Sequence, residues 1–222
     1  MRHNGRVVLG ESVPGWPVRG ELLDIAFQVR PRNLRENLVF IHEQLYRKCV
    51  CGTNVGVSFV IRLAQREDAP YLCEIYNHAV RTTTATLETQ ERDLATQIMW
   101  LAQHDGQPYP CFVAEDREGL ILGWASLSPY NPKPGYRRTA EDSVYVDVAA
   151  QGSGIGQALL QALLDAAPER GIQTIIALIT SDNTVSLRLH EKLGFTRVGT
   201  LERVGHKFGR DVDVTLLQWH TP

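Results

Sequence analysis

The sequence predicts an α/β fold in which a mixed, mostly antiparallel central sheet carries helices on both faces. Runs of β-branched and aromatic residues alternate along the chain with segments whose apolar residues recur every three or four positions. The expected order of elements, β-α-α-β-β-β-α-β-α-β-β, is typical of such a sheet. The continuous apolar run within Thr174–Thr180 indicates a strand that is buried in it.

Composition bounds the classes of function that the chain can have. The 222 residues suffice for one domain of roughly 150–170 residues plus an extension. Lys and Arg (23) do not exceed Asp and Glu (25), so nothing indicates nucleic acid as a partner. No apolar stretch is long enough to span a bilayer, and no signal-peptide core is recognisable. We therefore expect a cytoplasmic protein without a membrane partner.

The four cysteines predict reduced thiols and no metal site. They lack a paired C-x-x-C spacing, and Cys49-Val-Cys51 alone cannot complete a zinc site. Thiols in this pattern suit the reducing cytoplasm better than a disulfide framework does.

Two regions are expected along the chain. Residues 1–57 form an N-terminal extension, which we expect to be partly disordered because its first twenty residues are rich in Gly and Pro. Within it, Asn33–Lys48 has apolar residues at helical spacing and predicts one amphipathic helix. This helix could serve in docking or dimerisation, or the extension could be a weakly ordered leader. Residues 58–222 are the expected compact domain.

The first part of the compact domain predicts one strand and two helices. Phe59–Ala64 is rich in β-branched and aromatic residues, which favours a strand. Acidic residues precede Pro70–Ala79, whose apolar residues recur at helical spacing. A threonine-rich connection follows Arg81, and Arg92–Gln103 is expected to form the second helix.

The rest of the domain predicts a hairpin and then alternating strands and helices. Cys111–Ala114 and Ile121–Leu127 are expected to pair across the turn at 115–119. Pro129–Tyr136 holds three prolines and a glycine, which predicts an exposed loop. The remaining expected elements are a strand at 143–149, a helix at 157–167, the strand Thr174–Thr180, a helix at 184–193 that ends before Gly194, and strands at 195–201 and 212–219.

A glycine-rich turn before the expected helix at 157–167 predicts an anion site. The N–H groups in the first turn of a helix have no internal partners, and glycine lets a phosphate approach the main chain. The spacing of Gly152, Gly154 and Gly156 fits neither the dinucleotide fingerprint nor a P-loop, which would need a lysine here. A plain strand–helix turn is the alternative interpretation.

The motif Gln151-x-x-Gly154-x-Gly156 resembles the acetyl-coenzyme A pyrophosphate loop of the GCN5-related N-acetyltransferases (GNAT). The order of elements matches that fold, and the segment from Asn183 to Phe195 resembles its coenzyme A-side helix. Further blocks resemble the phosphinothricin acetyltransferase branch over about residues 59–219. They are Tyr76–Val80, Thr83–Glu88, Ser126–Tyr130, Tyr136–Val146, Leu189–Phe195 and Gly205–Val214.

The resemblance implies a GNAT domain at 58–222 that is an acetyl-CoA-dependent N-acetyltransferase, and relatives in this branch are typically homodimers. The implied acceptor is the α-amino group of a small amino acid such as phosphinothricin, methionine sulfoximine or methionine sulfone, acetylated by direct attack in a ternary complex. The residues implied to bind acetyl-CoA are Val144, Tyr145, Val146, Gln151, Gly152, Ser153, Gly154, Ile155, Gly156, Gln157, Asn183 and Ser186.

Glu141 and His190 are the expected catalytic residues. An α-amino group is mostly ammonium at neutral pH, so a carboxylate near the start of the strand could act as base, directly or through one water. The resemblance places a catalytic glutamate at Glu141. His190 stands where many GNAT enzymes carry a tyrosine as general acid, and imidazole titrates near neutral pH. A surface glutamate at a strand end and a satisfied, buried histidine are the respective alternatives.

The acceptor site is less specifically indicated. Two residues depart from the branch: Asn131 stands where relatives often carry Arg, and Asp211 where they often carry Trp. A neutral amide cannot replace a guanidinium, and an added carboxylate would suit a cationic amine. Acetylation of a protein N-terminus or of a polyamine is therefore an alternative, as is a non-catalytic acetyl-CoA-binding module. The candidate substrate-binding residues are Thr84, Thr86, Glu88, Asn131, Lys133, Arg137, Asp142 and Ser143.

Overall fold

The computed structural model describes residues 58–104 and 108–221. The N-terminal extension (1–57), with the helix expected at 33–48, lies outside the described residues. Among the helices that are described, none is long and apolar enough to cross a membrane.

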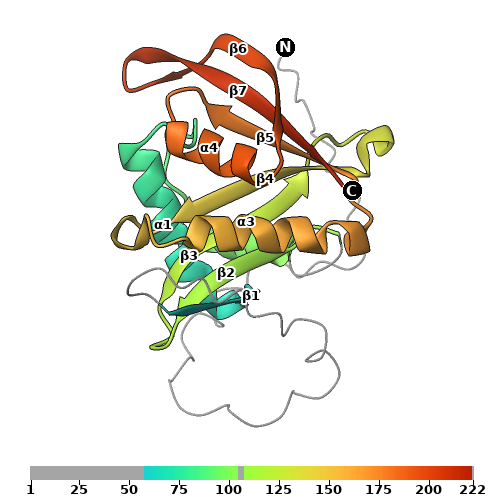
Figure 1. The fold of residues 1–222 in the computed structure, drawn as a ribbon. Coiled ribbons are helices and arrows are strands. Elements are labelled where there is room, and N and C mark those ends of the chain that lie inside the picture. Colours follow the sequence, from blue (N-terminus) through green and yellow to red (C-terminus); the bar gives the residue numbers. More distant parts are fainter. Residues whose placement is uncertain (1–57, 105–107, 222) are drawn as a thin grey trace, which may run out of the picture. The chain divides into compact units, whose positions relative to one another are not determined.

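The described residues form a seven-stranded mixed sheet, as expected (Figure 1). Its strands lie in the order β1-β2-β3-β4-β5-β7-β6, and every neighbouring pair is antiparallel except β4 and β5, which are parallel. The strands are β1 (Phe59–Leu63), β2 (Cys111–Asp116), β3 (Ile121–Pro129), β4 (Thr139–Val146), β5 (Thr174–Thr180), β6 (Thr196–Lys207) and β7 (Arg210–His220).

Helices cover both faces of the sheet, which confirms the predicted class of fold (Figure 1). On one face, α1 (Ala69–Thr82) packs with α2 (Leu94–Ala102) over the side of the sheet that carries Val113 and Trp124. On the other face, α3 (Ile155–Ala166) buries its leucines against Phe112 and Ala125. The short helix α4 (Thr184–Lys192) follows β5 and ends before Gly194, whose φ of 93° is the left-handed cap that the sequence predicted.

The order of helices and strands is the predicted one, but several boundaries differ for local reasons. β4 begins four residues earlier than expected, because its ladder with β3 continues to the pair Pro129–Ala140. It ends at Val146, since the Asp147 carboxylate then accepts a hydrogen bond from the N–H of Ala149 and turns the chain. α2 begins at Leu94 because Asp93 caps it.

The feature that positions the site is a fork between β4 and β5. These parallel strands pair only over Thr139–Glu141 and Thr174–Ile176. Beyond Glu141, β4 remains paired with β3 but diverges from β5. The main-chain groups of β4 that face β5 therefore lack a strand partner over residues 142–146.

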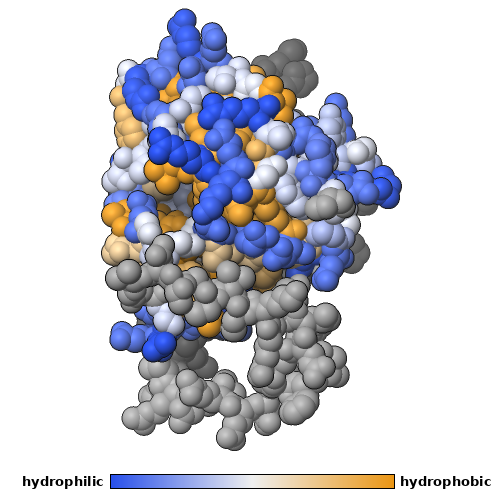
Figure 2. All heavy atoms as spheres, in the orientation of Figure 1, coloured by the Kyte–Doolittle hydropathy of each residue, from blue (hydrophilic) through white to orange (hydrophobic). Residues whose placement is uncertain are grey.

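The hairpin of β6 and β7 projects beyond the fork, and β6 is exposed along nearly its whole length. On the face shown in Figure 2, hydrophobic atoms are visible between hydrophilic side chains. Val185 of α4 and Val198 of β6 are among the exposed apolar residues.

Candidate active site

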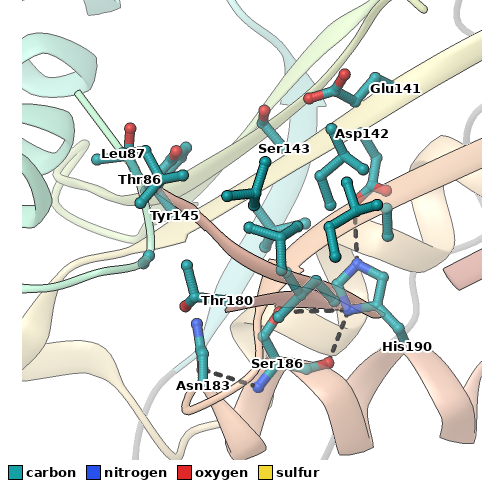
Figure 3. Close-up of a pocket in the computed structure, with 18 residues that line it drawn as sticks. Thr86, Leu87, Glu141, Asp142, Ser143, Tyr145, Thr180, Asn183, Ser186 and His190 are labelled. Carbon is teal, nitrogen blue, oxygen red and sulfur yellow. Dashed lines mark hydrogen bonds and ion pairs between the residues drawn. The ribbon is translucent and has the colours of Figure 1, made fainter. Parts of the chain in front are cut away.

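A cavity of about 340 Å³, here called the fork cavity, opens where β4 and β5 diverge. Its walls are the divergent part of β4, the end of β5 from Ala177 to Thr180, and one side of α4 (Figure 3). Residues 85–87 and apolar side chains of the β6–β7 hairpin close it. Of the residues implied to bind acetyl-CoA, the fork cavity brings together Val144, Tyr145, Asn183 and Ser186.

The glycine loop leads into α3 and leaves its first turn open. Gly152 has a φ of 78° and Gly154 one of 87°, and a Cβ added to either would meet no atom within 4 Å. The first N–H groups of α3 have no intrahelical partners. A diphosphate therefore has both space and main-chain donors at this helix end, together with the positive end of the helix dipole.

Lys192, which sequence reasoning did not single out, lies beside this loop. Its ammonium donates a hydrogen bond of 2.8 Å to the side chain of Gln157 in the first turn of α3. No lysine lies near the glycines in sequence, so the P-loop comparison could not find it; the packing of α4 beside α3 brings it there. This contact adds a positive charge to the predicted anion site.

Both parts of the site fit a coenzyme A thioester. The free main-chain edge of β4 offers hydrogen bonds of the strand type to a chain that contains amides. The open N-terminus of α3 suits the diphosphate. Among the described residues, no group of histidine, cysteine or acidic side chains is arranged to hold a metal ion.

Glu141 lies at the mouth of the fork, at the last position where β4 pairs with β5. Its side chain is half-buried and lines the fork cavity as well as a second cavity on the other side of β4. Burial, followed by the charge of neighbouring Asp142, raises the pKa of this carboxyl above its usual value. A carboxylate of raised pKa is a stronger base, which suits it to take a proton from an amine.

His190 is tied into the protein by both ring nitrogens. It is only 2% exposed, and its Nε2 lies 2.9 Å from the Asp142 carboxylate, while its Nδ1 lies 2.7 Å from the carbonyl oxygen of Ser186 (Figure 3). Because both partners accept hydrogen bonds, only the protonated imidazolium can donate to both. Burial, the largest single cause, lowers the pKa of His190, but the hydrogen bond and charge of Asp142 together with the Ser186 carbonyl raise it above its usual value.

This arrangement matches the structural alternative for His190, a satisfied histidine between a helix and the sheet. The ring also lines the fork cavity, so a role as general acid stays a prediction. The Asp142–His190 pair joins β4 to α4 one residue beyond the point where β4 and β5 separate.

The second cavity, of about 420 Å³, lies on the α1 side of β4 and is here called the aromatic cavity. Four aromatic side chains pack in its wall, with ring centroids 4.8 Å apart for Trp124 and Tyr145 and 5.3 Å apart for Tyr76 and Tyr145. Glu141 is common to both cavities. The cavity is lined by Tyr76, Thr86, Leu87, Glu88, Arg92, Trp100, Trp124, Ser128, Glu141, Ser143 and Tyr145.

Three of the predicted substrate-binding residues line the aromatic cavity: Thr86, Glu88 and Ser143. Asp142 does not, because successive side chains of a strand point to opposite faces. It turns away from Glu141 and Ser143 toward His190, as Figure 3 shows. The structure thus gives the Asp142 carboxylate a buried protein partner in place of the predicted substrate contact.

The other four predicted substrate-binding residues also lie outside the aromatic cavity. The Thr84 hydroxyl donates 2.9 Å to the Asp182 carboxylate, and the Asn131 side chain accepts from the N–H of Lys133 at 3.0 Å in a local turn. Lys133 and Arg137 are exposed on a segment that leaves the sheet between β3 and β4. Both side chains are in solvent and line neither cavity.

The charged residue that does line the aromatic cavity, besides the two glutamates, is Arg92. Sequence reasoning missed it because Arg92 lies at the expected start of α2, far from β4 along the chain. No motif or spacing relates it to Glu141. Only the packing of α1 and α2 on the sheet brings it there.

Comparison with known proteins gives these cavities a context. The chain matches the acetyltransferase (GNAT) family over residues 72–195. It is 42% identical over 162 residues to an L-methionine sulfoximine/L-methionine sulfone acetyltransferase of Pseudomonas paraeruginosa, across 73% of this chain and 94% of that protein.

Two solved structures extend the comparison. A GNAT superfamily phosphinothricin acetyltransferase from Sinorhizobium meliloti, in complex with acetyl-CoA, superposes with a TM-score of 0.71 at 33% identity, over 73% of this chain and 88% of that one. A ribosomal-protein-alanine N-acetyltransferase from Brucella melitensis gives a TM-score of 0.70 at 42% identity, over 72% and 99% of the two chains.

Proposed function

This chain belongs to the acetyltransferase (GNAT) family, and on that premise we propose that it acetylates the α-amino group of a small amino acid with acetyl-CoA. The proposed acceptors are of the methionine sulfoximine, methionine sulfone and phosphinothricin type, which the names of the relatives specify. The observation that carries the proposal is the position of Glu141, whose side chain lines both the fork cavity and the aromatic cavity. An amine in the aromatic cavity can thus meet a base next to the fork.

Each cavity has its own task in this proposal. The fork cavity takes the pantetheine arm, with the main chain of Val144–Val146 as its hydrogen-bonding edge, and the open turn at 152–157 takes the diphosphate. Acetyl-CoA supplies the activated acetyl group. The aromatic cavity takes the amino acid.

Proton transfer falls to Glu141. An α-ammonium must lose a proton before its nitrogen can attack, and the raised pKa of Glu141 makes its carboxylate able to accept that proton, directly or through one water. A main-chain N–H of the free β4 edge is suited to stabilise the negative charge that develops on the attacked carbonyl oxygen.

The alternative acceptors are a polyamine or a protein N-terminus, and the name of the Brucella melitensis protein favours the latter. The sequence argument for a cationic amine rested on Asp211. In the structure Asp211 lies on the exposed β6–β7 hairpin, where its carboxylate accepts from Arg203 at 2.9 Å and from His206 at 3.1 Å. It lines neither cavity, so this departure gives no support to a cationic acceptor.

Release of free thiol from acetyl-CoA tests the proposal. Methionine sulfoximine, methionine sulfone and phosphinothricin would be compared with spermidine and a short peptide, with Glu141→Gln in parallel. We expect turnover of the amino acids that is lost in Glu141→Gln. Turnover of only spermidine or the peptide would contradict the acceptor class, and cofactor binding without any turnover would favour a non-catalytic module.

We further propose a cytoplasmic homodimer, because the resemblance to this branch implies a dimer and the cysteine pattern suits a reducing compartment. Light scattering on the full chain after size-exclusion chromatography measures the mass directly. A monomeric mass would contradict the dimer.

A further inference from the structure

Arg92 is held at the wall of the aromatic cavity by its own main chain. The side chain of Asn77 in α1 accepts from the N–H of Arg92 and donates to its carbonyl oxygen, each at 2.8 Å. Asn77 is buried, so this double hydrogen bond fixes the position at which the Arg92 side chain leaves the backbone. The anchor does not depend on the guanidinium.

The guanidinium itself has aromatic but no acidic partners. It stacks on Tyr76 with its central carbon 3.9 Å from the ring centroid, and it lies 5.6 Å from the centroid of Trp100. Among the described residues, its one hydrogen bond to another side chain is a long one, of 3.4 Å, to the neutral amide of Gln97. No ion pair within the described residues includes Arg92.

Arg62 provides a half-buried comparison within the same domain. Arg62, which is half-buried like Arg92, has carboxylates at 2.5 and 2.7 Å. At Arg92 the aromatic rings and the neutral amide compensate only part of the hydration that this half-buried charge has lost, so it attracts an anion. At Arg92 the place for that anion is the cavity that its side chain lines.

We propose that Arg92 is the binding residue for the α-carboxylate of the acceptor, an inference that rests on the proposed function. An amino acid whose amine meets Glu141 carries its carboxylate one carbon away, in the same cavity. There two glutamates, Glu88 and Glu141, would repel it. Arg92 is the cation among the described residues of the cavity wall, whereas Lys133 and Arg137 are exposed outside it.

The stacking on Tyr76 suits this role. It occupies one face of the planar guanidinium and leaves the N–H groups at its edge to form paired hydrogen bonds with a carboxylate. The site would therefore select α-amino acids over amines that have no carboxylate.

Kinetics with a matched pair of acceptors test the proposal. L-methionine sulfone and its α-carboxamide differ in the carboxylate alone, and both would be assayed by thiol release with the full chain. The variants are Arg92→Gln, Arg92→Lys and Arg137→Gln, with Arg117→Gln as a charge-matched control in the exposed turn between β2 and β3. Affinity for acetyl-CoA, measured by calorimetry, reports whether each variant is folded.

We expect the wild type to prefer the acid, and Arg92→Gln to raise KM for the acid by about 10- to 100-fold while KM for the amide stays unchanged. Arg92→Lys should give an intermediate KM, since it keeps the charge but loses the planar fork. Arg137→Gln and Arg117→Gln should behave like the wild type.

Several results would overturn the inference. They are equal KM values of the wild type for acid and amide, an equal loss for both acceptors in Arg92→Gln, or a loss of acid preference in Arg137→Gln. The wild-type comparison decides even if Arg92→Gln fails to fold. If the wild type turned over spermidine or a peptide but neither form of the sulfone, the proposed function would fail first, and this inference with it.

Discussion

The fork cavity and the aromatic cavity lie on either side of β4 and are built in different ways. The fork cavity depends on main-chain geometry: a strand edge without a partner after Glu141, and a glycine turn before α3. The aromatic cavity is built from side chains that come from α1, the connection to α2, α2 itself, β3 and β4. The fork cavity is centred on two strands that are neighbours in the sheet and is completed by α4, residues 85–87 and the β6–β7 hairpin, whereas the aromatic cavity is framed by packed side chains.

This difference explains why the two cavities have different freedom to change. Main-chain hydrogen bonds are available whatever the side chains are. A fork cavity can therefore keep its fit to acetyl-CoA while the side chains around it change. The aromatic cavity changes its selectivity with each substitution in its wall. In this chain, Arg92 can hold an anion that Asn131 cannot.

Replacing Glu141, the carboxylate that lines both cavities, should have the largest effect. We expect Glu141→Gln to lower kcat/KM by about 100- to 10,000-fold, because the general base is lost while both cavities keep their shape. Acetyl-CoA affinity should stay unchanged in calorimetry. Glu118→Gln in an exposed turn is the control, and an equal loss of cofactor affinity would show that Glu141 is structural.

The same residue predicts a pH dependence. Only ionised Glu141 can accept a proton, and its pKa is raised by burial and then by the charge of Asp142. The kcat/KM of the wild type should therefore rise with pH through a value above that of an ordinary glutamate. A rate profile recorded from about pH 4 to 9 checks this, and an acid limb at the ordinary glutamate value would speak against Glu141 as the titrating base.

The Asp142–His190 pair, on the fork side, should matter next, and for stability in particular. Because its folded-state pKa is raised above 6.5, His190 adds stability that is fully present below pH 6.5 and is lost as pH rises through the raised value. Asp142→Asn should lower the free energy of unfolding at pH 6 by about 1–3 kcal/mol and flatten this pH dependence.

Urea unfolding at pH 6, 7 and 9 measures the effect, with the exposed Asp165→Asn as control. A pH dependence that persists in Asp142→Asn would mean that the pair is not its origin.

Variants of Gly154 test whether acetyl-CoA binding depends on the main-chain conformation of the glycine turn. A Cβ at this position would meet no atom, so Gly154→Ala introduces only the strain of a φ of 87°. We expect a cost of about 1–2 kcal/mol for the bound loop, or roughly tenfold in KM for acetyl-CoA, with KM for the acceptor unchanged. Gly154→Asn should be milder, since asparagine tolerates this conformation. Equal effects of both variants would contradict the explanation.

The smallest effect is expected at Gly205, whose neighbour Leu87 lines both cavities. A Cβ at Gly205 of β6 would lie 2.6 Å from Cδ1 of Leu87, which lines both cavities. The end of a leucine side chain can yield, so Gly205→Ala should change KM for both substrates by about two- to fivefold. Gly199→Ala on the same strand, where a Cβ would meet nothing, is the control. A change in only one KM would show that Leu87 does not affect both cavities.

The sequence by itself determined much of the fold and the cofactor side. Strand and helix periodicities depend on near neighbours in the chain, and they predicted the α-helices and strands of the described residues in their order, though not the short 3-10 turns; Thr174–Thr180 even has the predicted bounds. The glycine turn and the strand before it predicted the place of the anion site for the same reason, because local backbone geometry is set by adjacent residues.

Only the tertiary structure decided which side chains meet. It turned Asp142 toward His190 instead of the acceptor, left Arg137 in solvent, and brought Arg92 to the aromatic cavity. These contacts join residues tens of positions apart, and they depend on how α1, α2 and α4 pack on the sheet. Sequence spacing does not predict that packing. The residues of the aromatic cavity could therefore be identified only in the folded structure.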